Sequence, residues 1–198
     1  MKLYILRHED RTMDLTFFSP LTKNGLEKSV DLIEKLEKER INQIYSSPYI
    51  RTLQTIYPYS KKYNLRPKLD YSITELYQEG NIPKKSYQVT IPEYIADSFN
   101  YDKEYKSMIM PNKIEFPESI RNFDNRIKAF LKNIIKNNYE KDNNVLLVTH
   151  QGVIDIIMRI ISKRNSNLKD SVNQLKYPKG ALTKILDNTE WKFDKINW

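Results

Sequence analysis

The chain of 198 residues contains only two histidines, His8 and His150. Each closely follows a short apolar run that is typical of a buried strand, residues 2–6 in one case and 145–148 in the other. The carboxyl ends of strands are where open α/β sheets bind ligands. A single histidine in such a place is most often incidental, but both histidines of this chain occupy equivalent places. We therefore predict that the two imidazoles meet in one site.

Two arginines lie beside these histidines or at a similar place in the chain. Arg7 precedes His8, and Arg51 lies just after a third predicted strand, in the run Ser-Ser-Pro-Tyr-Ile-Arg. An arginine there can be a solvated helix residue, yet guanidinium groups match the oxygens of phosphate better than an ammonium does. Gly152 opens a helix after His150, so backbone N–H groups could also face an anion. This set of residues suits a tetrahedral oxyanion.

The first half of the chain predicts helices and strands in alternation. Apolar residues spaced by four and three predict a helix whose buried stripe is Leu26, Val30, Ile33 and Leu36. Residues 41–45 resemble a second strand, and a helix is expected to start at Pro48. Pro58 should break or kink that helix. A weaker strand is expected near residues 68–69.

The second half continues the alternation. A helix is predicted over residues 118–137, then the strand 145–148 and an apolar helix over 153–161. The stripe of the first of these helices is Ile120, Phe123, Ile127, Phe130 and Ile134. Residues 181–186 and 191–193 flank Asp187-Asn188 like the two strands of a hairpin. We predict one domain over residues 1–198, a three-layer α/β/α sandwich with a mostly parallel sheet.

Residues 81–117 do not follow this alternation. Several prolines and tyrosines interrupt the segment, and no clean period emerges. We interpret residues 81–117 as a lid-like insertion over the active-site edge of the sheet, where substrate specificity would lie.

The composition restricts the classes of protein that are possible. There is no cysteine, so disulfides and cysteine-based sites are excluded. No apolar run approaches a membrane span, and we expect a soluble, cytoplasmic protein. The formal charge is +8 and the pI is about 9.4, but the lysines are scattered, which speaks against a nucleic-acid-binding arm. The sequence indicates no oligomeric state.

A set of motifs, in order along the chain, resembles the histidine phosphatase superfamily, also called phosphoglycerate-mutase-like. The motifs are Leu6-Arg7-His8, Ser19 to Gly25, Tyr45 to Thr55, Ile73-Thr-Glu75 with Gly80, Pro117-Glu-Ser119 with Arg126, and Val148 to Gly152. The resemblance covers residues 3 to about 160, and residues 81–113 match nothing in it. Arg-His alone is a weak signal, whereas the ordered set is strong.

The resemblance implies a phosphatase that hydrolyses a phosphomonoester through a phosphohistidine on His8. It implies that Arg7, Arg51 and His150 clamp the phosphoryl oxygens, and that no metal or cofactor takes part. Glu75 is the implied general acid, with Glu79 as the alternative; the Ile-x-Glu spacing favours Glu75. Further phosphate contacts are expected from Arg11, Gln151 and Gly152. The expected partner is a small phosphorylated molecule.

Two departures from the family pattern leave other functions open. The family glycine after the first histidine is Glu9 here, and its carboxylate should repel phosphate unless it is turned away or paired; we predict a pair with Arg11. Glu9 therefore leaves open an alternative to the phosphatase, namely a catalytically weak protein that binds phosphate and acts through interactions.

The acid segment of phosphoglycerate mutases typically reads Glu-Arg-His-Tyr-Gly, whereas residues 75–79 read Glu-Leu-Tyr-Gln-Glu. This difference favours hydrolysis over a mutase-type phosphotransfer.

Overall fold

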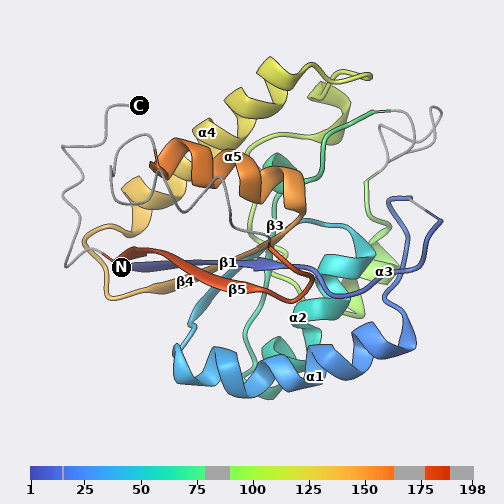
Figure 1. The fold of residues 1–198 in the computed structure, drawn as a ribbon, viewed down its shortest axis with the longest axis vertical. Coiled ribbons are helices and arrows are strands. Elements are labelled where there is room, and N and C mark those ends of the chain that lie inside the picture. Colours follow the sequence, from blue (N-terminus) through green and yellow to red (C-terminus); the bar gives the residue numbers. More distant parts are fainter. Residues whose placement is uncertain (15, 79–89, 163–176, 188–198) are drawn as a thin grey trace.

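The computed structural model describes residues 1–14, 16–78, 90–162 and 177–187. In this part of the chain a five-stranded sheet lies between two layers of helices (Figure 1). The strands are β1 (Lys2–Arg7), β2 (Gln43–Ser46), β3 (Lys68–Leu69), β4 (Asn144–Thr149) and β5 (Leu182–Asp187). The helices are α1 (Lys23–Lys38), α2 (Ile50–Lys62), α3 (Glu93–Asp97), α4 (Ile120–Asn138) and α5 (Gln151–Ser162), with short 3-10 helices η1 (Tyr71–Ile73) and η2 (Pro111–Lys113).

The sheet has the strand order β3-β2-β4-β1-β5, and only β5 runs antiparallel to its neighbour. In the register of the parallel strands, Arg7 pairs with Thr149 and Ser46 pairs with Val148. The residues that follow β1, β4 and β2 therefore leave the sheet side by side, at its carboxyl edge. The predicted α/β sandwich with a mostly parallel sheet is confirmed.

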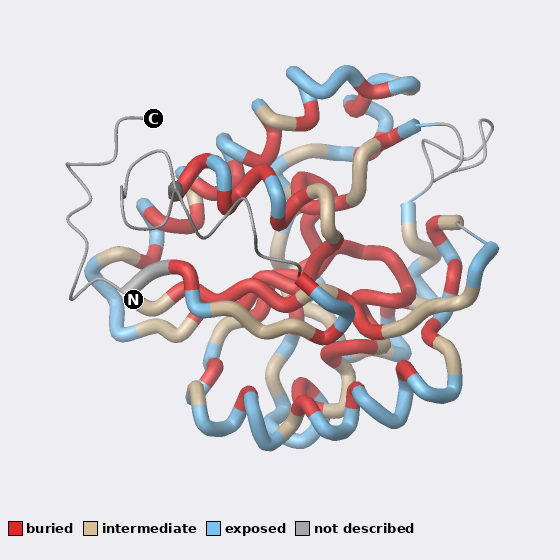
Figure 2. The backbone as a smooth tube through the Cα atoms, in the orientation of Figure 1, coloured by how far each residue is buried: buried red, intermediate tan, exposed pale blue. Residues whose placement is uncertain are grey.

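Both faces of the sheet are buried, as Figure 2 shows along the central strands. In β1, Leu3 and Ile5 point to the core under α4 and α5, while Tyr4 and Leu6 point to the core over α1 and α2. This alternation follows from the two-residue period of a strand, and burial on both faces explains the continuous apolar runs.

Two helices begin at side-chain caps. The Thr22 hydroxyl accepts a hydrogen bond from the Gly25 amide at the start of α1, and the Ser119 hydroxyl accepts one from the Asn122 amide at the start of α4. Hydroxyl caps satisfy amides that have no partner within the helix. The caps fix where both helices start beside the carboxyl edge.

The predicted stripe of α1 is wrong at its first two residues. Leu26 and Val30 are 43% and 53% exposed, whereas the neighbouring Gly25 and Ser29 are buried. A Cβ on residue 25 would lie 2.1 Å from the Asp10 carbonyl oxygen. The small residues therefore face inward because α1 approaches the loop after β1 closely, which an apolar period cannot reveal.

One further expectation on a helix is wrong. Ile120 is 61% exposed because it opens α4 before the helix reaches the core, although the rest of the predicted stripe is buried. At Pro58 a break or a kink was expected; the break does not occur, because α2 continues to Lys62. An interior proline costs roughly 3 kcal/mol, and the buried residues on both sides of it, Ile56 and Tyr59, provide packing that offsets this cost.

The described part of the insertion, residues 90–117, is attached to the sheet edge through Asp70. This buried carboxylate accepts hydrogen bonds from the Tyr105 hydroxyl (2.5 Å), the Ser107 hydroxyl (3.2 Å) and the Met108 amide (3.1 Å). The first part of the insertion, to residue 89, and the second strand of the predicted hairpin lie outside the described residues. None of the described helices combines the length and apolar character needed to cross a membrane.

Candidate active site at the carboxyl edge of the sheet

The two histidines meet as predicted. Their ring centroids are 5.3 Å apart, and the His8 amide donates to the carbonyl of Thr149, the residue before His150. The parallel pairing of β1 and β4 carries both rings to the same edge. His8 is 5% exposed and His150 is fully buried.

His8 is held in one tautomer by its own chain. Its Nδ1 lies 2.7 Å from the Glu9 carbonyl oxygen, which can only accept, so Nδ1 carries the proton and Nε2 has a free lone pair. Burial, together with the positive charge of Arg51, lowers the pKa of His8 to about 3. The imidazole is therefore neutral at physiological pH, as a nucleophile must be.

His150 is held through its other nitrogen. Its Nε2 lies 2.8 Å from the Ser47 hydroxyl oxygen, and the Tyr49 ring packs edge-on at 4.8 Å. Its Nδ1 is buried and has no hydrogen-bond partner within the described residues. Burial lowers the pKa of His150 well below its ordinary value, and the charge of Arg51 adds to this effect.

Arg51 and Arg7 add two guanidinium groups near the rings. Arg51, in the first turn of α2, is 5% exposed, lies 4.4 Å above the Tyr49 ring and donates to the Thr16 carbonyl at 2.9 Å. Arg7 donates to the Tyr177 carbonyl at 2.6 Å. In the described part of the chain the Nε groups of both arginines are buried without an acceptor. Burial lowers the pKa of Arg51 to about 10, so the group stays charged at neutral pH.

Glu75 reaches the site from the segment after η1. Its carboxylate lies 3.4 Å from the Gly152 amide at the start of α5, and a Cβ on residue 152 would be 2.3 Å from Glu75 Oε1. Burial raises the pKa of Glu75, against the effect of the amides of Leu76 and Gly152. Burial lowers the pKa of Arg7, and the nearby negative charge of Glu75 opposes this effect. A raised pKa suits a general acid. The alternative acid, Glu79, lies outside the described residues.

The remaining predicted residues lie close by with other partners. Arg11 donates to the Thr12 carbonyl at 2.8 Å, and its charge lowers the pKa of both His8 and His150. The Gln151 amide group donates to Asp155 at 2.6 Å along α5. The Gly152 amide faces Glu75.

The predicted pair between Glu9 and Arg11 is wrong. Glu9 is 4% exposed, and a Cβ on Gly180 would lie 1.8 Å from its Oε1. No ion pair within 4 Å joins Glu9 to a described residue, and Oε2 has no hydrogen-bond partner among them. The side chain fills the space that Gly180, with φ +71°, leaves beside the backbone. Burial raises the pKa of Glu9.

Three residues around the rings had no predicted role. Ser47 bonds His150, Tyr49 supports both His150 and Arg51, and the Thr55 hydroxyl accepts from the Glu9 amide at 2.9 Å. Ser47 directly follows β2, so the strand-end rule that selected the histidines also applies to it. The contacts of Tyr49 and Thr55 arise from helix packing and have no such signal.

A mostly parallel sheet whose carboxyl edge brings together two imidazoles and two guanidinium groups defines a class of α/β enzymes that handle phosphate. The sequence pattern described as histidine phosphatase superfamily (branch 1) matches residues 6–198. The chain belongs to the histidine phosphatase superfamily. The predicted family and the predicted class of enzyme, a phosphomonoester hydrolase, are confirmed.

Curated relatives and solved structures agree with this membership. Phosphoserine phosphatase 1 of Hydrogenobacter thermophilus is 27% identical over 132 residues, 66% of this chain and 58% of that protein. The structure of ecdysone phosphate phosphatase from Bombix mori, in complex with tungstate, covers 94% of this chain and 92% of its own, with a TM-score of 0.68 and 15% identity. The alpha-ribazole phosphatase from Shigella flexneri covers 93% and 89%, with a TM-score of 0.62 and 19% identity. At 15% and 19% identity, these two structures show that the chain has the same fold.

Proposed function

We propose that the protein hydrolyses a small phosphomonoester in two displacements at His8, with a phosphohistidine between them. One observation carries this proposal. Three buried nitrogen atoms near His8, namely Arg7 Nε, Arg51 Nε and His150 Nδ1, have no hydrogen-bond partner within the described residues. A buried polar group without a partner costs about 1–3 kcal/mol. A tetrahedral dianion would supply acceptors to the two guanidinium groups and offset their charge, and it would accept from His150 in the tautomer that carries its proton on Nδ1.

In the first displacement, the Nε2 lone pair of His8 attacks phosphorus. The N–P bond forms as the bond from phosphorus to the ester oxygen breaks, and the leaving oxygen takes the proton of Glu75. The fixed hydrogen bond from Nδ1 to the Glu9 carbonyl keeps the attacking nitrogen unprotonated. The donors around the phosphoryl group stabilise the charge of its oxygens in the transition state.

In the second displacement, a water molecule gives a proton to the Glu75 carboxylate and attacks phosphorus. The N–P bond breaks, its electrons return to His8 Nε2, and inorganic phosphate leaves. Glu75 ends protonated and ready for the next ester. The raised pKa of Glu75 suits this alternation between acid and base.

The comparisons support the class of substrate but name no substrate for this chain. Similar proteins are named for phosphoserine, ecdysone phosphate and alpha-ribazole phosphate chemistry, all small molecules. The structure of one of them is a complex with tungstate, a tetrahedral oxyanion, which is in line with the proposed binding of phosphate. We place the protein in the cytoplasm on the basis of the sequence.

The test is turnover of an aryl phosphate by the wild type and His8→Ala, with mass analysis of the acid-quenched and base-quenched proteins. We expect wild-type protein to carry an acid-labile phosphoryl group on residue 8 during turnover. We expect His8→Ala to carry none and to lose turnover. Robust turnover by His8→Ala would exclude the mechanism.

A further inference from the structure

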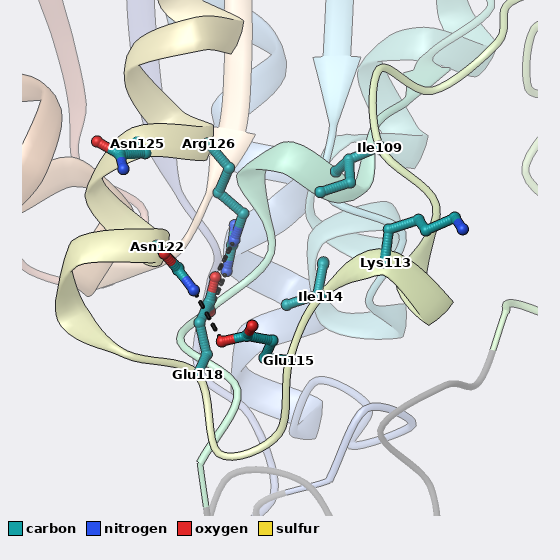
Figure 3. Close-up of a pocket in the computed structure, with 8 residues that line it drawn as sticks. All are labelled: Ile109, Lys113, Ile114, Glu115, Glu118, Asn122, Asn125 and Arg126. Carbon is teal, nitrogen blue, oxygen red and sulfur yellow. Dashed lines mark hydrogen bonds and ion pairs between the residues drawn. The ribbon is translucent and has the colours of Figure 1, made fainter.

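A buried ion pair outside the phosphate clamp lies beside the segment that carries Glu75. Arg126 of α4 and Glu118 point toward one another (Figure 3), with Arg126 Nε 2.7 Å from Glu118 Oε1 and Nη2 2.9 Å from Oε2. They are 8% and 7% exposed. A buried pair of this kind is weak evidence for stability, since desolvation offsets its attraction. Its contacts with neighbouring residues give it a more specific role.

Arg126 binds the backbone of the acid segment at three places. Nη1 donates to the carbonyls of Ser72 (2.7 Å) and Thr74 (3.0 Å), and Nη2 donates to the carbonyl of Glu75 itself (3.2 Å). Glu118 binds the same segment on the other side of residue 75, because its Oε2 accepts from the Tyr77 amide (3.2 Å) and its amide donates to the Tyr77 carbonyl (2.6 Å).

The Glu75 carboxylate, by contrast, has only long hydrogen bonds within the described part of the chain. It accepts from the amides of Leu76 at 3.2 Å and Gly152 at 3.4 Å. Its place therefore depends on how the backbone from Ser72 to Tyr77 is held.

The cavity next to the pair helps to define this role. It has a volume of about 340 Å³ and is lined by Ile109, Lys113, Ile114, Glu115, Glu118, Asn122, Asn125 and Arg126 (Figure 3). A guanidinium has five N–H donors, and all five of Arg126 are engaged by Glu118 and the three carbonyls. Arg126 thus has no donor left for a ligand in the cavity.

We propose that Arg126, oriented by Glu118, is a positioning residue that fixes the general acid Glu75 beside Gly152. The proposal rests on the proton-transfer role proposed above for Glu75. It makes a prediction that general structural support would not make. Loss of the clamp should impair proton delivery to the leaving group much more than attack on phosphorus.

The test compares two substrates, the phosphate ester of a simple primary alcohol and p-nitrophenyl phosphate. The alkoxide needs a proton to leave, whereas p-nitrophenolate does not. We expect Arg126→Met to lower kcat/KM for the alkyl ester by roughly 10²-fold, the lower range of general acid catalysis, and to change the aryl ester by about threefold or less. Glu118→Gln should show the same selectivity to a smaller degree, and Arg126→Lys should fall between wild type and Arg126→Met.

Controls separate this proposal from the one it rests on. Arg121→Met, on an exposed position of the same helix, should leave both substrates unchanged. Equal losses for the two substrates in Arg126→Lys and Glu118→Gln, which perturb the fold least, would overturn the positioning role. Glu75→Gln reports separately on the acid, because equal losses there would overturn Glu75 itself. Thermal unfolding reveals whether Arg126→Met folds. If it does not, the selectivity of Arg126→Lys and Glu118→Gln between the two substrates tests the positioning role.

Discussion

The two histidines occupy equivalent strand ends, but the protein holds them in opposite ways. Among the described residues, His8 bonds a backbone carbonyl through Nδ1 and has no partner for Nε2, whereas His150 bonds the Ser47 hydroxyl through Nε2 and has no partner for Nδ1. A carbonyl can only accept, so it fixes the tautomer of His8. A hydroxyl can donate or accept, so the contact with Ser47 is compatible with either neutral tautomer of His150. The difference supports the proposed roles, in which His8 attacks phosphorus and His150 stabilises charge.

Replacing each histidine in turn with alanine should give the largest effects on kcat/KM. We expect His8→Ala to lower kcat/KM by roughly 10⁴-fold or more, as loss of a nucleophile does. His150→Ala should cost roughly 10²–10³-fold, the effect of removing one donor to a developing charge. Quenched-protein mass analysis checks the difference, since His150→Ala should still carry a phosphoryl group on residue 8. Its absence there would contradict the separate roles.

The proposed acid, Glu75, lies beside His150, because its carboxylate contacts the amide of Gly152. Glu75 must be protonated to assist the leaving group, and burial raises its pKa. Activity on an alkyl ester should therefore fall by about tenfold per pH unit once the pH exceeds that raised pKa. Glu75→Gln should lower the plateau by roughly 10²–10⁴-fold and remove this limb. The measurement is the pH profile of kcat/KM; a limb that persists in Glu75→Gln would assign it to another group.

The hydroxyl that orients His150 offers a smaller perturbation. Ser47→Ala removes a single neutral hydrogen bond, worth about 1 kcal/mol, so kcat/KM should fall about fivefold. Phosphorylation of residue 8 should persist. Ser29→Ala is a matched control, since Ser29 is also buried but its hydroxyl donates to the carbonyl of Leu26 in its own helix. An equal loss of kcat/KM in Ser29→Ala would mean that the Ser47 hydroxyl has no specific role at His150.

Next to His8 lies the buried carboxylate of Glu9. We expect its ionisation to affect the thermal stability of the fold. The folded-state pKa of Glu9 is raised, so its stabilising contribution is full below the ordinary glutamate pKa and is lost as pH rises through the raised value. Glu9→Gln is neutral at all pH and should raise Tm at pH 8 by a few degrees, as about 1 kcal/mol does. The gain should shrink toward pH 4.

Thermal unfolding of the two proteins across this range is the measurement. Glu27→Gln, at an exposed position of α1, provides the control. A gain that does not depend on pH would show that ionisation of Glu9 is not its cause.

The sequence predicted the sites of chemistry better than the surroundings of those sites. Apolar runs that end at His8 and His150 are enough to place both rings at one edge, because parallel strands end together. The same reasoning did not foresee that Gly180 leaves space for Glu9, since the two residues are far apart in sequence. It also missed Tyr49, whose contacts come from the packing of α2 against the edge.

By itself the sequence determined the alternation of strands and helices, the family and the identity of the residues at the strand ends. These depend on local period and on motifs, which are written along the chain. The tertiary structure alone decided which nitrogen of each imidazole is free, where the Glu9 carboxylate lies and how Arg126 holds the acid segment. Each of these depends on contacts between residues distant in sequence, where close packing and the partners of buried polar groups are set by the whole fold.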